Sequence, residues 1–157
     1  MRRLWTLILL LAGCAGGTNA PQPPPGGADL SGLIQDTISI NGSDFVVWLA
    51  QSDAQRQAGL MFATAEQMAP LPDGTERGML FLFSNSFFLS FYMRNTFIPL
   101  DLAYIRADGT IAEIFDLFPL NETSIVSGEP VQFALEVNAG VFAALGIGVG
   151  DQVILPP

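Results

Sequence analysis

The chain contains the stretch LDLAYIRADGTIAEIFDL at residues 100–117, and this stretch indicates its fold class. Apolar runs occupy both ends, and between them stands Asp108-Gly109, a pair that favours the tight turn of a β-hairpin. The pattern therefore predicts two antiparallel strands, at residues 100–106 and 110–117, joined by a short turn.

Similar signals occur on both sides of this hairpin. Ile38 and Ile40 alternate with a serine and precede Asn41-Gly42, which predicts a second hairpin. The run at 79–83 is apolar on both faces, as is typical of a central strand. Patterns of apolar, β-branched and aromatic residues place the other strands at residues 45–49, 89–95, 131–137 and 152–155.

Two short helices complete the prediction. Ser52 and Gln55 have the spacing of a capping box, so a helix is expected over residues 53–60. Residues 139–145 allow about two helical turns, which Gly146 would end. The sequence therefore predicts a mainly β fold, a single compact domain of sandwich or barrel type with two short helices.

Composition excludes several classes of function. The chain has no histidine and one cysteine, Cys14, which rules out Ser-His-Asp and Cys-His catalytic groups and His/Cys metal sites. Its methionines and acidic residues lack the close spacing of a copper site or a calcium loop. A net charge of −9 repels phosphate backbones. We therefore expect no metal, no cofactor and no nucleic-acid partner.

The N-terminus is predicted to be an export signal and a lipid anchor. Residues 1–14 read MRRLWTLILLLAGC, and the apolar run at 4–11 spans roughly 12 Å, too little for the ~30 Å core of a bilayer. The end of this segment, Leu11-Ala12-Gly13-Cys14, resembles the lipobox of bacterial lipoproteins. The resemblance implies a signal peptide at residues 1–13, cleaved before Cys14, and a lipidated Cys14 that anchors the chain in the membrane.

A tether and a globular domain are expected to follow. Residues 14–32 are rich in glycine and proline, and their extended part could reach roughly 45 Å from the bilayer. Residues 33–157 would form the domain. Similarity to Gram-negative sorting signals, with Ala15 after the cysteine, implies an outer-membrane location facing the periplasm.

The candidate binding residues are Arg56, Arg94, Asn95 and Asp101. The last three lie in FYMRNTFIPLD at residues 91–101, where polar side chains end one apolar strand and begin another. Asn95 and Asp101 would pin the bend by capping backbone amides, the interpretation that we favour, or all three would line a ligand cleft. Arg56 and Glu136 stand among apolar neighbours and are expected to form ion pairs, although Arg56 could instead face an anionic ligand.

Five groups of residues resemble the domain of unknown function 192 family over residues 37–155. Tyr92 stands where tryptophan is expected, and Arg94 where lysine is usual. The resemblance implies a compact β-sandwich-like fold, often exported, and supplies no activity. The groups are Arg56-x-x-Gly59-Leu60-Met61, Gly78-Met79-Leu80-Phe81-x-Phe83, Phe91-Tyr92-Met93-Arg94-Asn95-Thr96-x-Ile98-Pro99-Leu100-Asp101, Leu135-Glu136-Val137-x-Ala139-Gly140 and Gly146-Ile147-x-x-Gly150-Asp151.

Three functions are compatible with these features. The first, which we choose, is a non-catalytic binding module for a small ligand, a glycan or an envelope protein. The second is an envelope hydrolase or lyase that uses Asp101 with a second acid, Glu136 or Asp151, and it requires the two carboxyl groups to lie ~5–10 Å apart around a cleft. The third is a structural envelope protein.

Overall fold

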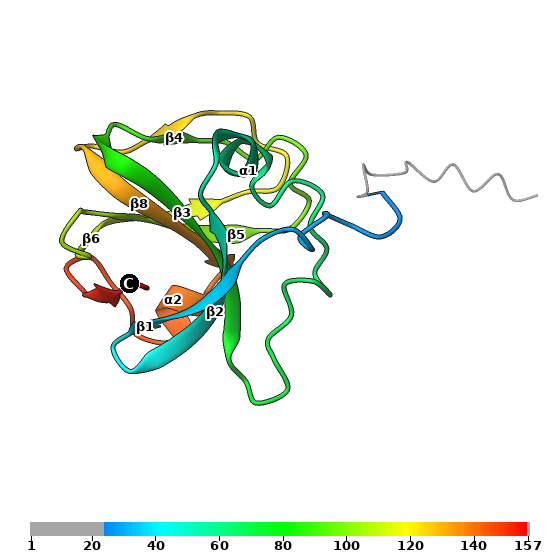
Figure 1. The fold of residues 1–157 in the computed structure, drawn as a ribbon, viewed down its shortest axis with the longest axis horizontal. Coiled ribbons are helices and arrows are strands. Elements are labelled where there is room, and N and C mark those ends of the chain that lie inside the picture. Colours follow the sequence, from blue (N-terminus) through cyan, green and yellow to red (C-terminus); the bar gives the residue numbers. More distant parts are fainter. Residues whose placement is uncertain (1–23, 157) are drawn as a thin grey trace, which may run out of the picture.

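The computed structural model describes residues 24–156, so the predicted signal peptide and Cys14 lie outside the described residues. Two sheets and two short helices make up the domain, and the mainly β fold class is confirmed (Figure 1). The strands are β1 (Gln35–Ile40), β2 (Ser43–Ala50), β3 (Glu76–Phe87), β4 (Ser90–Phe91), β5 (Leu100–Ile105), β6 (Ile111–Leu117), β7 (Ile125–Val126), β8 (Val131–Asn138) and β9 (Val153–Ile154); the helices are α1 (Asp53–Ala58) and α2 (Val141–Ala144).

The main sheet has seven strands in the order β6-β5-β8-β3-β2-β1-β9. All neighbours are antiparallel except β2 and β3, which are parallel because the chain crosses over through α1 and the loop after it. Both predicted hairpins are present. The turn between β1 and β2 places Asn41 and Gly42 at φ of 52° and 79°, and Gly109 has φ of 86° in the turn between β5 and β6.

The sheet curls until its two edges meet, which gives a half-barrel. Ile111 of β6 donates its backbone N–H to the carbonyl of Asp151 (2.9 Å), and Val153 of β9 donates to the carbonyl of Gly109 (2.9 Å). The concave side encloses an aliphatic core that α2 closes. The other side of the sheet carries a second core, rich in aromatic and methionine side chains, under α1 and the small β4–β7 sheet.

The largest error of the sequence prediction concerns residues 89–95, which were expected to form one alternating strand. Only Ser90–Phe91 is a strand, paired with β7. The chain turns afterwards because Asn95 takes a left-handed φ of 54° and Met93 donates its N–H to the carbonyl of Asn121 (2.8 Å). β3 is also longer than predicted, since it continues past a register shift after Leu82.

Candidate functional site

A pocket of about 340 Å³ lies between α1, the second half of β3 and the segment that leads into and out of β4. Aromatic and aliphatic side chains dominate its wall, and a few polar and charged groups interrupt them. The lining residues are Asp53, Arg56, Gln57, Ala58, Gly59, Leu60, Met61, Phe81, Phe83, Phe88, Leu89, Ser90, Phe91, Tyr92, Thr96 and Glu136. This composition is typical of small-molecule sites.

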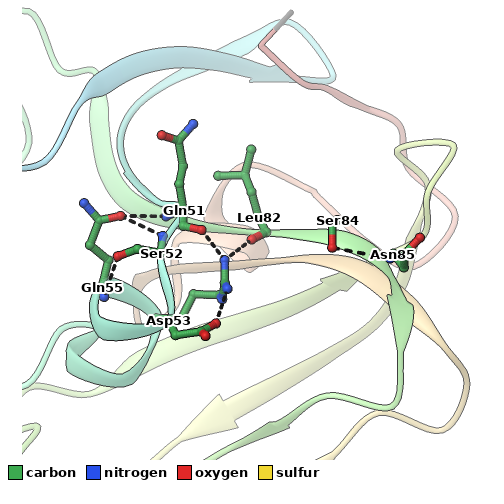
Figure 2. Close-up of polar contacts among 8 residues, drawn as sticks. Gln51, Ser52, Asp53, Gln55, Leu82, Ser84 and Asn85 are labelled. Carbon is green, nitrogen blue, oxygen red and sulfur yellow. Dashed lines mark hydrogen bonds and ion pairs between the residues drawn. The ribbon is translucent and has the colours of Figure 1, made fainter.

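Helix α1 forms one wall, and local sequence dictates where it begins. The Ser52 hydroxyl accepts the N–H of Gln55 (3.2 Å), and the Gln55 side-chain oxygen accepts the N–H of Ser52 (2.9 Å), which completes the predicted capping box (Figure 2). The helix ends at Gly59, whose φ of 48° and ψ of −138° favour glycine. No residue of α1 is buried.

Arg56 attaches α1 to β3. Its guanidinium donates to the carbonyl of Leu82 (2.7 Å) and to the carbonyl of Gln51, and it pairs with Asp53 (Figure 2). The guanidinium carbon also lies 4.8 Å from the centre of the Phe83 ring. The expected ion pair of Arg56 is therefore confirmed, and much of its donor capacity is directed at protein acceptors.

Aromatic rings form a fixed wall beneath the helix. Phe81 and Phe91 meet edge to face with their centres 4.8 Å apart, and Phe91 meets Tyr104 in the same way at 5.8 Å. The Tyr104 hydroxyl donates to the carbonyl of Ile125 (2.6 Å), which links this wall to β7. Edge-to-face pairs of this kind add to the stability gained from burial alone, so the wall is preorganised.

Glu136 is the acidic residue deepest in the pocket. It projects from the central strand β8 on the same face as Met79 and Leu102, its cross-strand neighbours, and only 5% of its surface is exposed. Within residues 24–156, no hydrogen bond or ion pair engages its carboxyl group, so the ion pair expected from the sequence is wrong. Burial raises the pKa of Glu136 to about 8, so the group is mostly protonated at neutral pH.

The other predicted binding residues lie outside the pocket wall. Asp101 is buried and accepts the backbone N–H groups of Gly140 (2.9 Å) and Phe142 (3.4 Å). Arg94 is exposed and pairs with Glu122 through two N–H groups, at 3.0 and 2.8 Å. The structure thus brings only Arg56, of the four candidates, to the pocket.

Asn95 shapes the chain beside the pocket. Its backbone carbonyl accepts the N–H of Phe62 (2.7 Å), which joins the turn after β4 to the loop after α1. The next residue, Thr96, is buried and lines the pocket. Asn95 therefore shapes the bend through its backbone, and the side-chain capping that we favoured from the sequence is not seen for it among the described residues.

The hydrolase hypothesis requires Asp101 to face a second acid across a cleft, and the structure does not bring these carboxyl groups together. Asp101 lies opposite Val137 and Glu136 lies opposite Leu102, so the two carboxyl groups project from opposite faces of the sheet. Asp151 accepts the N–H of Gly148 (2.7 Å), stabilises the turn there and is not part of the pocket wall. In the part of the chain that the structure describes, no cluster of three or more acidic side chains is arranged to hold a metal ion.

The chain matches a known protein family. The model of a family described as "Uncharacterized ACR", domain of unknown function 192 (DUF192), matches residues 36–155. The chain belongs to the DUF192 family. The predicted resemblance is thereby confirmed, and no curated protein matches the chain.

Two solved structures are similar to this DUF192 chain. A protein from Sinorhizobium meliloti 1021, provisionally named a transcription regulator, is 36% identical with a TM-score of 0.70, over 77% of this chain and 93% of that one. A protein of unknown function from Novosphingobium aromaticivorans DSM 12444 is 33% identical with a TM-score of 0.71, over 87% and 94%.

The residues that carry the DUF192 resemblance converge on the pocket. Ten of its sixteen lining residues belong to four of the five groups, although these groups are spread over some 80 positions of the chain. The ten are Arg56, Gly59, Leu60, Met61, Phe81, Phe83, Phe91, Tyr92, Thr96 and Glu136. From the sequence, all ten were markers of the family resemblance, and only Arg56 was predicted to be a binding residue. The sequence did not show that these ten residues line one pocket, and this is why the site was missed.

Proposed function

We propose that this domain is a non-catalytic binding module that takes a small, largely apolar ligand into the pocket beside α1. The single observation that carries the proposal is the convergence of the family's residue groups on one pocket of about 340 Å³. Pockets of this size with apolar walls and a few convergent polar groups are the usual sites of small ligands.

Two features of the pocket support binding over the hydrolase alternative. Its wall contains the Glu136 carboxyl group, which has no partner among the described residues, and a set of fixed aromatic rings. Both can contact a small ligand. General acid–base cleavage of a glycoside needs two carboxyl groups across one cleft, and Asp101 faces away from Glu136.

We further propose that lipid on Cys14 holds the domain at the cell envelope, with a tether that begins at Cys14 and ends where Ala28 and Leu30 contact the domain. The apolar run and the lipobox-like Leu11-Ala12-Gly13-Cys14 support this location. Within residues 24–156 no helix is long and apolar enough to cross a membrane. Replacing Cys14 with serine should move the protein from the membrane fraction to the soluble fraction, and unchanged membrane association would contradict the anchor.

The binding proposal is tested by NMR on the mature chain, residues 14–157, carrying Cys14→Ser. A set of small aromatic compounds is added, and the backbone amide shifts of the domain are followed. We expect the shifts of binders to cluster at lining residues such as Gly59, Phe83 and Thr96. Shifts scattered over the surface, or concentrated elsewhere, would contradict the proposal.

A matched pair of variants sharpens this test. Ala58 is the last residue of α1, is exposed and lines the pocket, so Ala58→Phe should lower the affinity of these compounds at least several-fold by filling space. Ala144 is the exposed last residue of α2 and lies outside the pocket wall, so Ala144→Phe should leave binding unchanged. Equal effects of the two variants would exclude this pocket as the site.

A further inference from the structure

Among residues 24–156, Glu136 has no cationic side chain to neutralise it. The structure describes four arginines, and each is engaged elsewhere: Arg56 with Asp53, Arg77 over the Trp48 ring, Arg94 with Glu122 and Arg106 with Glu129. Glu136 is 95% buried as a residue, lines the pocket and makes no hydrogen bond or ion pair with the described residues, so its carboxyl group is the point where a ligand would complete the interactions. The group that would pair best with this carboxylate is a positively charged one that carries N–H donors.

The pocket wall suits a cation with an apolar body. Phe81, Phe83 and Phe91 line the same space as Glu136, and aromatic faces attract ammonium groups while they also accept apolar surface. Arg56 also lines the pocket, but its positive charge is offset by the ion pair with Asp53. The protein's net charge of −9 attracts cations and repels anions at long range.

We propose that the pocket binds a primary or secondary organic amine with an apolar, aromatic-sized body, and that its ammonium group pairs with the Glu136 carboxylate. The proposal rests on the proposed binding function and specifies its ligand class. The alternative that Arg56 receives an anion has less support, because the Arg56 N–H groups already donate to Leu82, Gln51 and Asp53.

Binding an amine at Glu136 requires a proton to leave. The free protein holds Glu136 mainly as the neutral acid, and the ammonium ligand arrives charged, so the O–H bond of the acid breaks and its proton passes to the buffer as the ion pair forms. The charged and titratable groups that share the surroundings of Glu136 are Tyr104 from β5, Tyr92 after β4, and Arg56 and Asp53 from α1. Burial, with the nearby acids Glu136 and Glu113, raises the pKa of the Tyr104 hydroxyl above its usual value, so this group stays protonated at neutral pH.

Calorimetry on the mature Cys14→Ser chain at pH 7, with phenethylamine, 2-phenylethanol and phenylacetate, tests the proposal. We expect the amine to bind at least tenfold more tightly than the alcohol, and the carboxylate to bind most weakly. Comparison of buffers with different ionisation enthalpies should show release of about 0.9 proton per bound amine, the fraction of Glu136 protonated at pH 7 for a pKa of about 8.

Variants connect the selectivity to one side chain. Glu136→Gln keeps the shape of the side chain and should remove both the preference for the amine and the proton release, while binding of 2-phenylethanol is retained. Glu66→Gln makes the same change of charge at an exposed position outside the pocket wall and should behave like the parent protein.

The contradictory outcomes are distinct. If 2-phenylethanol binds as tightly as the amine, or amine binding releases no proton, the amine inference is overturned and the pocket remains a binding site. If none of the three compounds binds, the amine inference is also overturned, and the NMR test with the wider set of compounds decides independently on the pocket.

Discussion

Two buried acids on adjacent strands of the main sheet have opposite surroundings. Asp101 on β5 and Glu136 on β8 are exposed to nearly the same small extent, 4% and 5%. Asp101 accepts two backbone N–H groups at the start of α2, where the N-cap Gly140 offers no side chain of its own. Glu136 faces the pocket on the other side of the sheet and has no such bonds within residues 24–156.

The difference separates a structural acid from a candidate functional one. Burial raises the pKa of both groups, but the backbone N–H donors partly compensate this effect at Asp101. A buried polar group without a partner lowers stability, so folding alone gives no reason to keep an acid at position 136. Ligand binding gives such a reason, because the pocket supplies space for the missing partner.

The largest effect is expected from the pH dependence of stability at Glu136. The pKa of this group is about 8 in the folded chain, against 4.5 for the unperturbed side chain. Between these values the folded state binds more protons than the unfolded state, so the free energy of unfolding falls as pH rises through this window. The loss amounts to about 5 kcal/mol when complete.

Glu136→Gln should remove this loss, since glutamine does not titrate. Urea unfolding from pH 4 to pH 9 should therefore show the variant gaining up to about 5 kcal/mol relative to the parent protein as pH rises. Glu66→Gln should follow the parent protein throughout. Parallel curves for the parent and Glu136→Gln would mean that Glu136 has a partner or water that stabilises its charge.

A smaller loss is expected from Asp101→Ala. Removing the carboxylate leaves the buried N–H of Phe142 and the N–H of Gly140 without their acceptor, so the free energy of unfolding should fall by about 2–3 kcal/mol. Asp101→Asn keeps one acceptor oxygen and should lose less, which separates hydrogen bonding from side-chain volume. If Asp101→Ala unfolds at the same urea concentration as the parent, the structural role of Asp101 is disproved.

Much of the fold was predictable because its decisive signals are local. The turn pairs Asn41-Gly42 and Asp108-Gly109 fix two hairpins, and the Ser52 and Gln55 spacing fixes the start of α1. The region after β4 was not predictable in the same way. Its turn depends on the bond from Met93 to Asn121, which lies 28 positions away.

The site shows the same limit more strongly. The strand predicted at residues 131–137 implies, because side chains alternate along a strand, that Glu136 faces away from Leu135 and Val137, and the structure shows this arrangement. Sequence alone gave no means of knowing that α1 and the β4 segment cover that face and leave a pocket there without a cation for Glu136. In the same way, the acceptor role of Asp101 depends on amides 39 and 41 positions further along the chain.

The most direct test of the account is an NMR titration of the Glu136 side-chain carboxyl carbon in the mature Cys14→Ser chain, without ligand and with saturating phenethylamine. We expect a midpoint near pH 8 in the free protein and a midpoint more than two pH units lower in the amine complex, since the predicted proton release at pH 7 requires an ionised Glu136 there. A midpoint near 4.5 in the free protein, or no change on addition of the amine, would contradict the claim that Glu136 is an unpartnered acid awaiting a cationic ligand.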